Sequence, residues 1–208
     1  MKITKIEQQK NNRSRYSIFV DGNFSVGVHE SVLFSEHLHV GDTITRDKIE
    51  ALEQADARFA AKDIAFNLLK YRQRSIGEMR SRLRKKDFDG VVIETIINEL
   101  KADGYLNDEE FALTYAEDQL TRKNIGPIRL KSELYKKQIP DKIVEKTVIQ
   151  IYQKYDVVEL ARNAAKKKKQ SLGNVDYQTA YRRMTSYLGR RGFPWDIITE
   201  VIDLEEWD

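Results

Sequence analysis

RSRLRKKDF, the stretch at residues 80–88, occurs in three related versions along this 208-residue chain. It returns as KSELYKKQI at residues 131–139, an offset of 131 − 80 = 51, and as TSYLGRRGF at residues 185–193, a further 185 − 131 = 54. Each version has Leu at its fourth position, a basic pair at its sixth and seventh, and an apolar residue at its ninth. Self-similarity at one period predicts a repeat protein.

Helix signals surround each version of this stretch. Ser75 and Glu78 have the spacing of a capping box, which opens a helix with Met79 and Leu83 facing inward. A helix starter follows each version, and an apolar helix follows the starter. The starters are Asp89, Pro140 and Pro194, and the first apolar helix should bury Val92, Ile93, Ile96, Ile97 and Leu100. Tyr71, Tyr105 and Tyr115 also fall at helix-packing positions. We expect three short helices per repeat. We also expect the repeats to pack in a row, because each repeat buries little apolar surface alone.

The first 45 residues have a different character. Residues 16–20 and 24–28 are rich in strand-forming residues and flank a short Gly-containing loop, and residues 3–9 can pair alongside them. A short helix is expected near residues 32–34, and Thr45 can cap the long helical part that follows. The expected fold is mainly α, with three tandem three-helix repeats preceded by a small N-terminal β-sheet. The expected segments are residues 1–50, 51–106, 107–155 and 156–208.

Composition excludes several classes of function. The chain has no cysteine, so a thiolate nucleophile and a Cys-based metal site are impossible. Without a signal peptide or a long apolar run, the sequence is typical of a soluble protein of the cytoplasm. His29, His37 and His39 lie close in sequence, but no third metal ligand accompanies them in an obvious way. We therefore expect no catalytic site, no cofactor and no metal.

Charge is unevenly distributed, although 36 basic and 33 acidic residues nearly balance. Basic residues gather on the second helix of each repeat, whereas acidic residues gather in residues 94–118 and in the tail around Trp207, at Glu205, Glu206 and Asp208. If the repeats stack regularly, these helices form a basic stripe that suits a polyanion. The plainer alternative is that these cations only complement helix dipoles. The candidate contact residues are Arg72, Arg74, Arg80, Arg84, Lys85, Lys86, Arg129, Lys131, Lys136, Lys137, Arg182, Arg183, Arg190 and Arg191.

Three stretches resemble the RecX family. They are AFNLLKYRQRSIGEMRSRL at residues 65–83, LKADGYLNDEEFA at residues 100–112 and GPIRL at residues 126–130. The resemblance covers roughly residues 57–205 and is weakest in the third repeat. Met79 stands where that family commonly has Leu, and Asp87 stands where it commonly has Gly.

This resemblance implies a regulator rather than an enzyme. RecX-like proteins bind the RecA recombinase and its filament on single-stranded DNA, and they restrain filament growth, ATP hydrolysis, strand exchange and repressor cleavage. They also bind DNA weakly, and no catalytic residues carry over. Two alternatives stay open: a stand-alone nucleic-acid-binding protein of helix-turn-helix type, and a scaffold that contacts only proteins.

Overall fold

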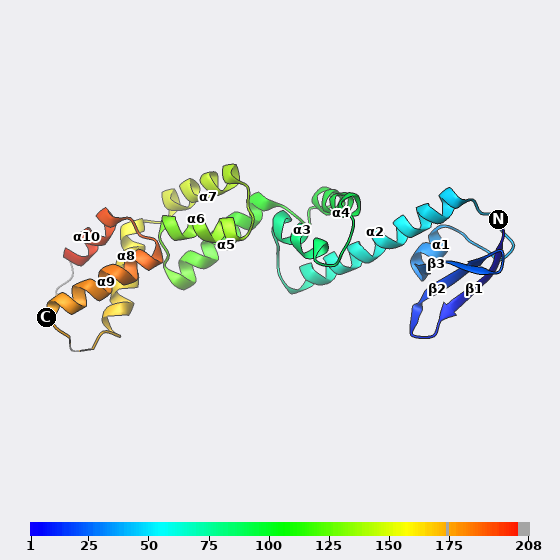
Figure 1. The fold of residues 1–208 in the computed structure, drawn as a ribbon. Coiled ribbons are helices and arrows are strands. Elements are labelled where there is room, and N and C mark those ends of the chain that lie inside the picture. The colour runs from blue at the N-terminus through cyan, green and yellow to red at the C-terminus, as the bar shows by residue number, and fades with distance from the viewer. Residues whose placement is uncertain (174, 204–208) are drawn as a thin grey trace. The chain divides into compact units, whose positions relative to one another are not determined.

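The protein is described by a computed structural model that covers residues 1–173 and 175–203 (Figure 1). Trp207 and the acidic residues Glu205, Glu206 and Asp208 lie outside the described residues. The chain divides into two compact units. Unit 1 comprises Met1–Gln73 and Met79–Tyr105, and unit 2 comprises Arg74–Glu78 and the chain from Leu106 onward.

Three strands and ten helices are described. Unit 1 holds β1 (Ile3–Gln9), β2 (Asn12–Val20), β3 (Asn23–His29), α1 (Glu30–Ser35), α2 (Arg46–Tyr71), most of α3 (Ile76–Arg84) and α4 (Gly90–Ala102). Unit 2 holds the first residues of α3, α5 (Asp108–Lys123), α6 (Pro127–Lys136), α7 (Asp141–Lys154), α8 (Val157–Lys169), α9 (Tyr177–Arg191) and α10 (Trp195–Asp203). The expected mainly helical fold behind a small sheet is confirmed.

The N-terminal sheet is antiparallel, in the order β1-β2-β3, with α1 directly after β3. Its buried face presents Ile3, Ile18 and Val28, which pack with Leu52 of α2 in one apolar cluster. The Thr45 side chain accepts a hydrogen bond from the Lys48 N–H, as the sequence predicts for a helix cap. From that cap α2 runs without a break through residue 50, so one helix belongs both to the sheet's core and to the first repeat.

The first repeat has the helix starts and the core that the sequence predicts. The Oγ of Ser75 accepts a 3.0 Å hydrogen bond from the Glu78 N–H, and the Asp89 carboxylate accepts one of 2.7 Å from the Val91 N–H. The expected core residues of this repeat are all buried, namely Met79, Leu83, Val92, Ile93, Ile96, Ile97 and Leu100.

One backbone feature recurs at the same position of all three repeats. Asp87, Gln138 and Gly192 follow the second helix of their repeats, and their φ angles are +60°, +58° and +81°. Their spacing is 138 − 87 = 51 and 192 − 138 = 54, which are the offsets of the repeat itself. The left-handed conformation ends each second helix and turns the chain into the third. Glycine adopts a positive φ more readily than other residues, which explains why Gly is common in the RecX-like pattern at the position of Asp87.

Repeats two and three of unit 2 share one apolar core. Leu134 and Leu188, the equivalents of Leu83, are fully buried in it, as is Val144, the equivalent of Ile93. Where the two repeats meet, the Gly126 N–H donates to the Arg191 carbonyl at 2.8 Å and the Ile128 N–H donates to the Gly192 carbonyl at 3.1 Å. The N-terminus of α6 therefore abuts the C-terminus of α9.

The same kind of contact joins residues 74–78 to α6, within unit 2. The Oγ of Ser75 donates to the Lys137 carbonyl, and a Cβ on Gly77 would approach Cβ of Gln138 to 2.4 Å. The start of one second helix again meets the end of the next. The expectation that neighbouring repeats pack in sequence is confirmed for the second and third repeats, which share the core of unit 2.

Two tyrosines are not core residues, contrary to the sequence-based expectation. Tyr71 is 85% exposed at the end of α2, and Tyr105 is 55% exposed with its ring edge-on to Phe66. The sequence placed Tyr71 at a helix-packing position, but α2 ends at this residue and its side chain is exposed. Tyr115 does pack against the core of unit 2.

Candidate polyanion-binding surface

In unit 1 the strongest candidate cations lie at the C-terminus of α3. Arg84, Lys85 and Lys86 are exposed, and within the described residues none of them forms an ion pair. The turn that ends at Asp87 holds them in place, because the Lys86 N–H donates to the Leu83 carbonyl at 2.9 Å. Cations at a helix C-terminus are stabilised by the dipole, but their charges remain available to a ligand.

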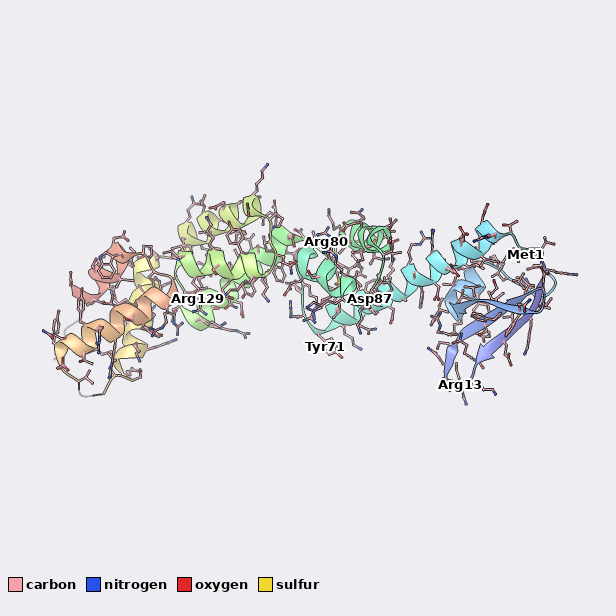
Figure 2. All side chains as sticks on the ribbon, viewed as in Figure 1. Met1, Arg13, Tyr71, Arg80, Asp87 and Arg129 are labelled. Carbon is pink, nitrogen blue, oxygen red and sulfur yellow. The ribbon has the colours of Figure 1, made fainter. Side chains whose placement is uncertain are left out.

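Arg80, which Figure 2 labels, lies on the same helix. Its side chain forms an ion pair with the Glu94 carboxylate. Its Nε and Nη2 atoms donate to the two carboxylate oxygens of Glu94 on α4, at 2.6 and 2.9 Å. The hydrogen bond from Arg80 lowers the pKa of Glu94 below its usual value. A bidentate pair of this kind fixes α3 against α4, so Arg80 holds the repeat together rather than presenting a free charge.

The two candidate arginines that flank the end of α2 differ in exposure. Arg72 is exposed, and its guanidinium donates to the Gln73 carbonyl at 2.7 Å. Arg74 is only 9% exposed, although the sequence made it a contact residue. The charge pattern alone cannot separate an exposed arginine from a buried one, and the burial of Arg74 removes it from the exposed surface.

On α6 most candidate cations are paired within unit 2. Lys131 donates to Glu145 on α7, and that hydrogen bond raises the Lys131 pKa. Arg129 lies 3.5 Å from Glu133 and donates to the Arg190 carbonyl at 3.0 Å. Lys137 pairs with Glu78 at 3.2 Å. Lys136 is the most exposed of the four and has only a loose contact, of 3.6 Å, with Glu133.

On α9 the candidates again separate into exposed and covered residues. Arg182, Arg183 and Arg190 are exposed, and their side chains form no ion pair within the described residues. The Arg191 guanidinium instead lies 4.9 Å from the centroid of the Tyr187 ring. Tyr187 packs against the core, and its ring makes a cation–π contact with Arg191.

One cationic residue of this site was not among the candidates. Lys168 of α8 lies with its Nζ 5.8 Å from the same Tyr187 ring, which brings the lysine run Lys166–Lys169 beside α9. Four consecutive lysines were visible in the sequence. Only the packing of α8 on α9 shows that they lie beside the basic residues of α9.

The histidines have structural partners. Nδ1 of His29 accepts a 3.2 Å hydrogen bond from the Ser31 N–H, and the ring stacks on Phe59 with centroids 4.0 Å apart. The His39 N–H donates to the Asp42 carboxylate at 2.7 Å. Over the described ranges, no cluster of three potential metal ligands is present, and none of the helices combines the length and hydrophobicity needed to cross a membrane.

Four family models match successive segments of the chain. The model described as the regulatory protein RecX N-terminal domain matches residues 1–45. Those described as the first, second and third three-helix domains of RecX match residues 61–100, 107–148 and 154–202. The third match confirms the third repeat, the copy with the weakest sequence pattern.

Whole proteins and solved structures agree with these matches. The chain is 32% identical to Regulatory protein RecX of Bacillus velezensis over 99% of its own length and 78% of the relative's. It is 28% identical to that of Clostridioides difficile over 97% and 94%. The match to a Listeria monocytogenes relative, at 35% identity, covers 80% of this chain and 60% of the relative.

Two crystal structures share the fold. The first, of regulatory protein RecX, aligns with a TM-score of 0.72 at 25% identity, over 97% of this chain and 98% of that one. The second, of RecX from Lactobacillus salivarius, aligns with a TM-score of 0.63 at 30% identity, over 72% and 96%. On the fold, the four successive models and these relatives, the chain belongs to the RecX family of regulatory proteins.

Proposed function

We propose that this protein binds the RecA recombinase and the filament that RecA forms on single-stranded DNA, and that it restrains filament growth, ATP hydrolysis and strand exchange. The observation that carries the proposal is the match of RecX regulatory-protein models to all four segments of the chain. The RecA protein is the main partner, and direct DNA binding is weaker.

The exposed cations support a polyanionic partner. Arg84 at the end of α3, Lys85 and Lys86 in the turn that follows it, and Arg182 and Arg183 on α9 form no ion pair within the described residues. Because no internal ion pair has to break, each can neutralise a phosphate at little cost. Binding of this kind releases counterions, so it weakens steeply with salt and tolerates any base sequence.

In this mechanism the protein lodges on the filament through its repeats. The exposed cations contact DNA phosphate or acidic filament surface, while acidic surfaces contact basic RecA surface or repel wrong partners. A protein bound across neighbouring subunits blocks the addition of further RecA or the rearrangement that accompanies ATP hydrolysis.

Filament growth tests the proposal directly. RecA filaments assembling on single-stranded DNA should grow more slowly with this protein, and the variant K85E/K86E/R182E/R183E should restore growth. The control K10E/R13E/K123E/K142E changes net charge equally at exposed cations outside the candidate set, and it should inhibit as the unmodified protein does. Sequence-selective DNA binding without any effect on RecA would instead support a stand-alone nucleic-acid-binding protein.

A further inference from the structure

Unit 1 contains an open groove between α2 and the start of α4. Its volume is about 480 Å³. Glu50, Glu53 and Arg58 of α2 line it on one side, and Asp89, Val91 and Thr95 line it on the other. The groove is distinct from the cationic surface described above, because none of the candidate cations lines it.

In the second repeat, an ion pair connects the first and third helices at the equivalent position. With the offset of 51, Arg58 corresponds to Glu109 and Thr95 to Lys146. Lys146 Nζ lies 2.9 Å from the Glu109 carboxylate, which bridges α7 and α5. The first repeat has an arginine and a threonine at these positions, so it lacks this ion pair beside the start of α4, where the groove lies.

One side of the groove is formed by a helical segment that the second repeat lacks. α5 begins at Asp108, which corresponds to residue 108 − 51 = 57, whereas α2 begins at Arg46. The first helix of repeat one is therefore 57 − 46 = 11 residues longer at its N-terminus. Glu50 and Glu53 lie on this extension and supply the carboxylates of the groove.

An exposed valine lies at the mouth of the groove. Val91 is 76% exposed, while its neighbour Val92 is 8% exposed. The positions equivalent to Val91 are 91 + 51 = 142 and 142 + 54 = 196, which are Lys142 and Asp196. Charged residues solvate this position in the other two repeats, so an aliphatic side chain here is specific to the groove.

The charges around Val91 define the chemistry of a ligand. The groove has three carboxylates and one guanidinium. Among the described residues Glu50 forms an ion pair with Arg46 alone, at 3.3 Å, and this pair is weak because both side chains are exposed. A net negative lining repels phosphate, so nucleic acid is disfavoured. A segment that sets a Lys or Arg beside an apolar side chain fits both the carboxylates and Val91.

We infer that this groove is the docking site for a basic and apolar segment of the RecA protein itself. The inference rests on the proposed function and deepens it: the groove binds the protein part of the filament, while the exposed cations of α3 and α9 bind its anionic part. A protein with two such surfaces binds RecA in the filament more tightly than it binds either component alone.

The decisive variant is E53K/V91K, because both residues are exposed and their replacement leaves the core intact. Its affinity for RecA without DNA should fall at least tenfold by surface plasmon resonance. The control E110K/I149K makes the same two types of substitution at exposed residues of unit 2, and it should bind RecA within threefold of the unmodified protein. Both variants should bind a single-stranded oligonucleotide equally, since their net charges match.

A second variant tests the groove by closing it. R58E/T95K rebuilds across the groove the ion pair that Lys146 and Glu109 form in the second repeat, and it should also weaken RecA binding at least tenfold. Unchanged RecA binding by both groove variants would overturn the inference and leave the proposed function standing. Failure of the unmodified protein to bind RecA would overturn both. A dimer in sedimentation velocity that E53K/V91K abolishes would assign the groove to a second copy and overturn the inference too.

Discussion

Nζ of Lys137 lies 3.2 Å from Oε1 of Glu78 and 5.3 Å from the centroid of the Tyr115 ring. The side chains of Lys137 and Glu78 are only 24% and 15% exposed, so solvent screens this pair less than it screens the other ion pairs of α6. The contact joins the chain segment 74–78 to the end of α6 within unit 2. A lysine that charge patterning placed on the binding surface is thus part of a junction between repeats.

Replacement of Lys137 should therefore lower stability. Lys137→Met keeps the aliphatic stem but leaves the Glu78 carboxylate without this cation, and we expect a loss of roughly 1–3 kcal/mol in the free energy of unfolding. Lys136→Met, at a neighbouring side chain that is 67% exposed, should change it by less than about 0.5 kcal/mol. Urea unfolding monitored by circular dichroism measures both. Equal effects of the two variants would mean that the junction pair contributes nothing.

The junction of repeats two and three depends on Gly192. Its φ is +81°, and a Cβ there would lie 2.2 Å from the Arg129 backbone nitrogen. Gly192→Ala combines left-handed strain with a backbone clash, so it should cost about 2–5 kcal/mol. Gly173→Ala has a similar φ of +67°, but no atom of the described residues would lie within 4 Å of its Cβ, and it should cost only about 1–2 kcal/mol. Thermal unfolding of the two variants isolates the clash, and similar melting temperatures would refute it.

Tyr115 in unit 2 should lose its proton at a higher pH than an ordinary tyrosine does. Burial raises the Tyr115 pKa to about 12, and the nearby Glu133 carboxylate adds to the shift. The unfolded chain loses this proton near pH 10, before the folded chain does, so the contribution of Tyr115 is complete below pH 10 and is lost as pH rises toward 12. Tyr115→Phe should remove one late step from the absorbance titration at 295 nm and make stability fall less between pH 10 and 12. A titration curve above pH 11 that keeps its amplitude in Tyr115→Phe would contradict the raised pKa.

Paired and unpaired cations should differ in their effect on salt dependence. If Lys85 and Lys86 each contact a phosphate of single-stranded DNA, K85A/K86A should lower the slope of log affinity against log salt by about 1.4. R80A/K131A removes the same net charge at residues whose side chains are held by Glu94 and Glu145, and its slope should stay near that of the unmodified protein. Fluorescence anisotropy across salt measures this, and equal slopes for both variants would show that internal pairing does not select the contact residues.

Most of the fold could be predicted from local sequence signals. The apolar face of α4, the Ser75 and Asp89 caps and the sheet pairing all follow from periodicity and capping chemistry, which act over a few residues. The length of α2 was harder to predict, because the same continuous helix packs against the sheet and forms the first helix of repeat one. The exposure of Tyr71 depends on where that helix ends, and spacing does not report this.

The candidate site was less predictable, because it depends on pairing between distant segments. Charge clustering found most cations of the second helices, but the carboxylates that neutralise Arg80, Lys131 and Lys137 come from other helices. The burial of Arg74 removes it from the candidate site, and the packing of α8 on α9 adds Lys168 to it. The groove beside Val91 became visible only when the structure showed which equivalent positions of the second repeat form an ion pair.

RecA ATP hydrolysis on single-stranded DNA, measured with and without this protein across a range of salt concentrations, tests the central claim most directly. The account predicts inhibition at low salt that weakens as salt rises and that K85E/K86E/R182E/R183E largely abolishes. An unchanged hydrolysis rate at every salt concentration, with a protein that is folded by circular dichroism, would contradict it.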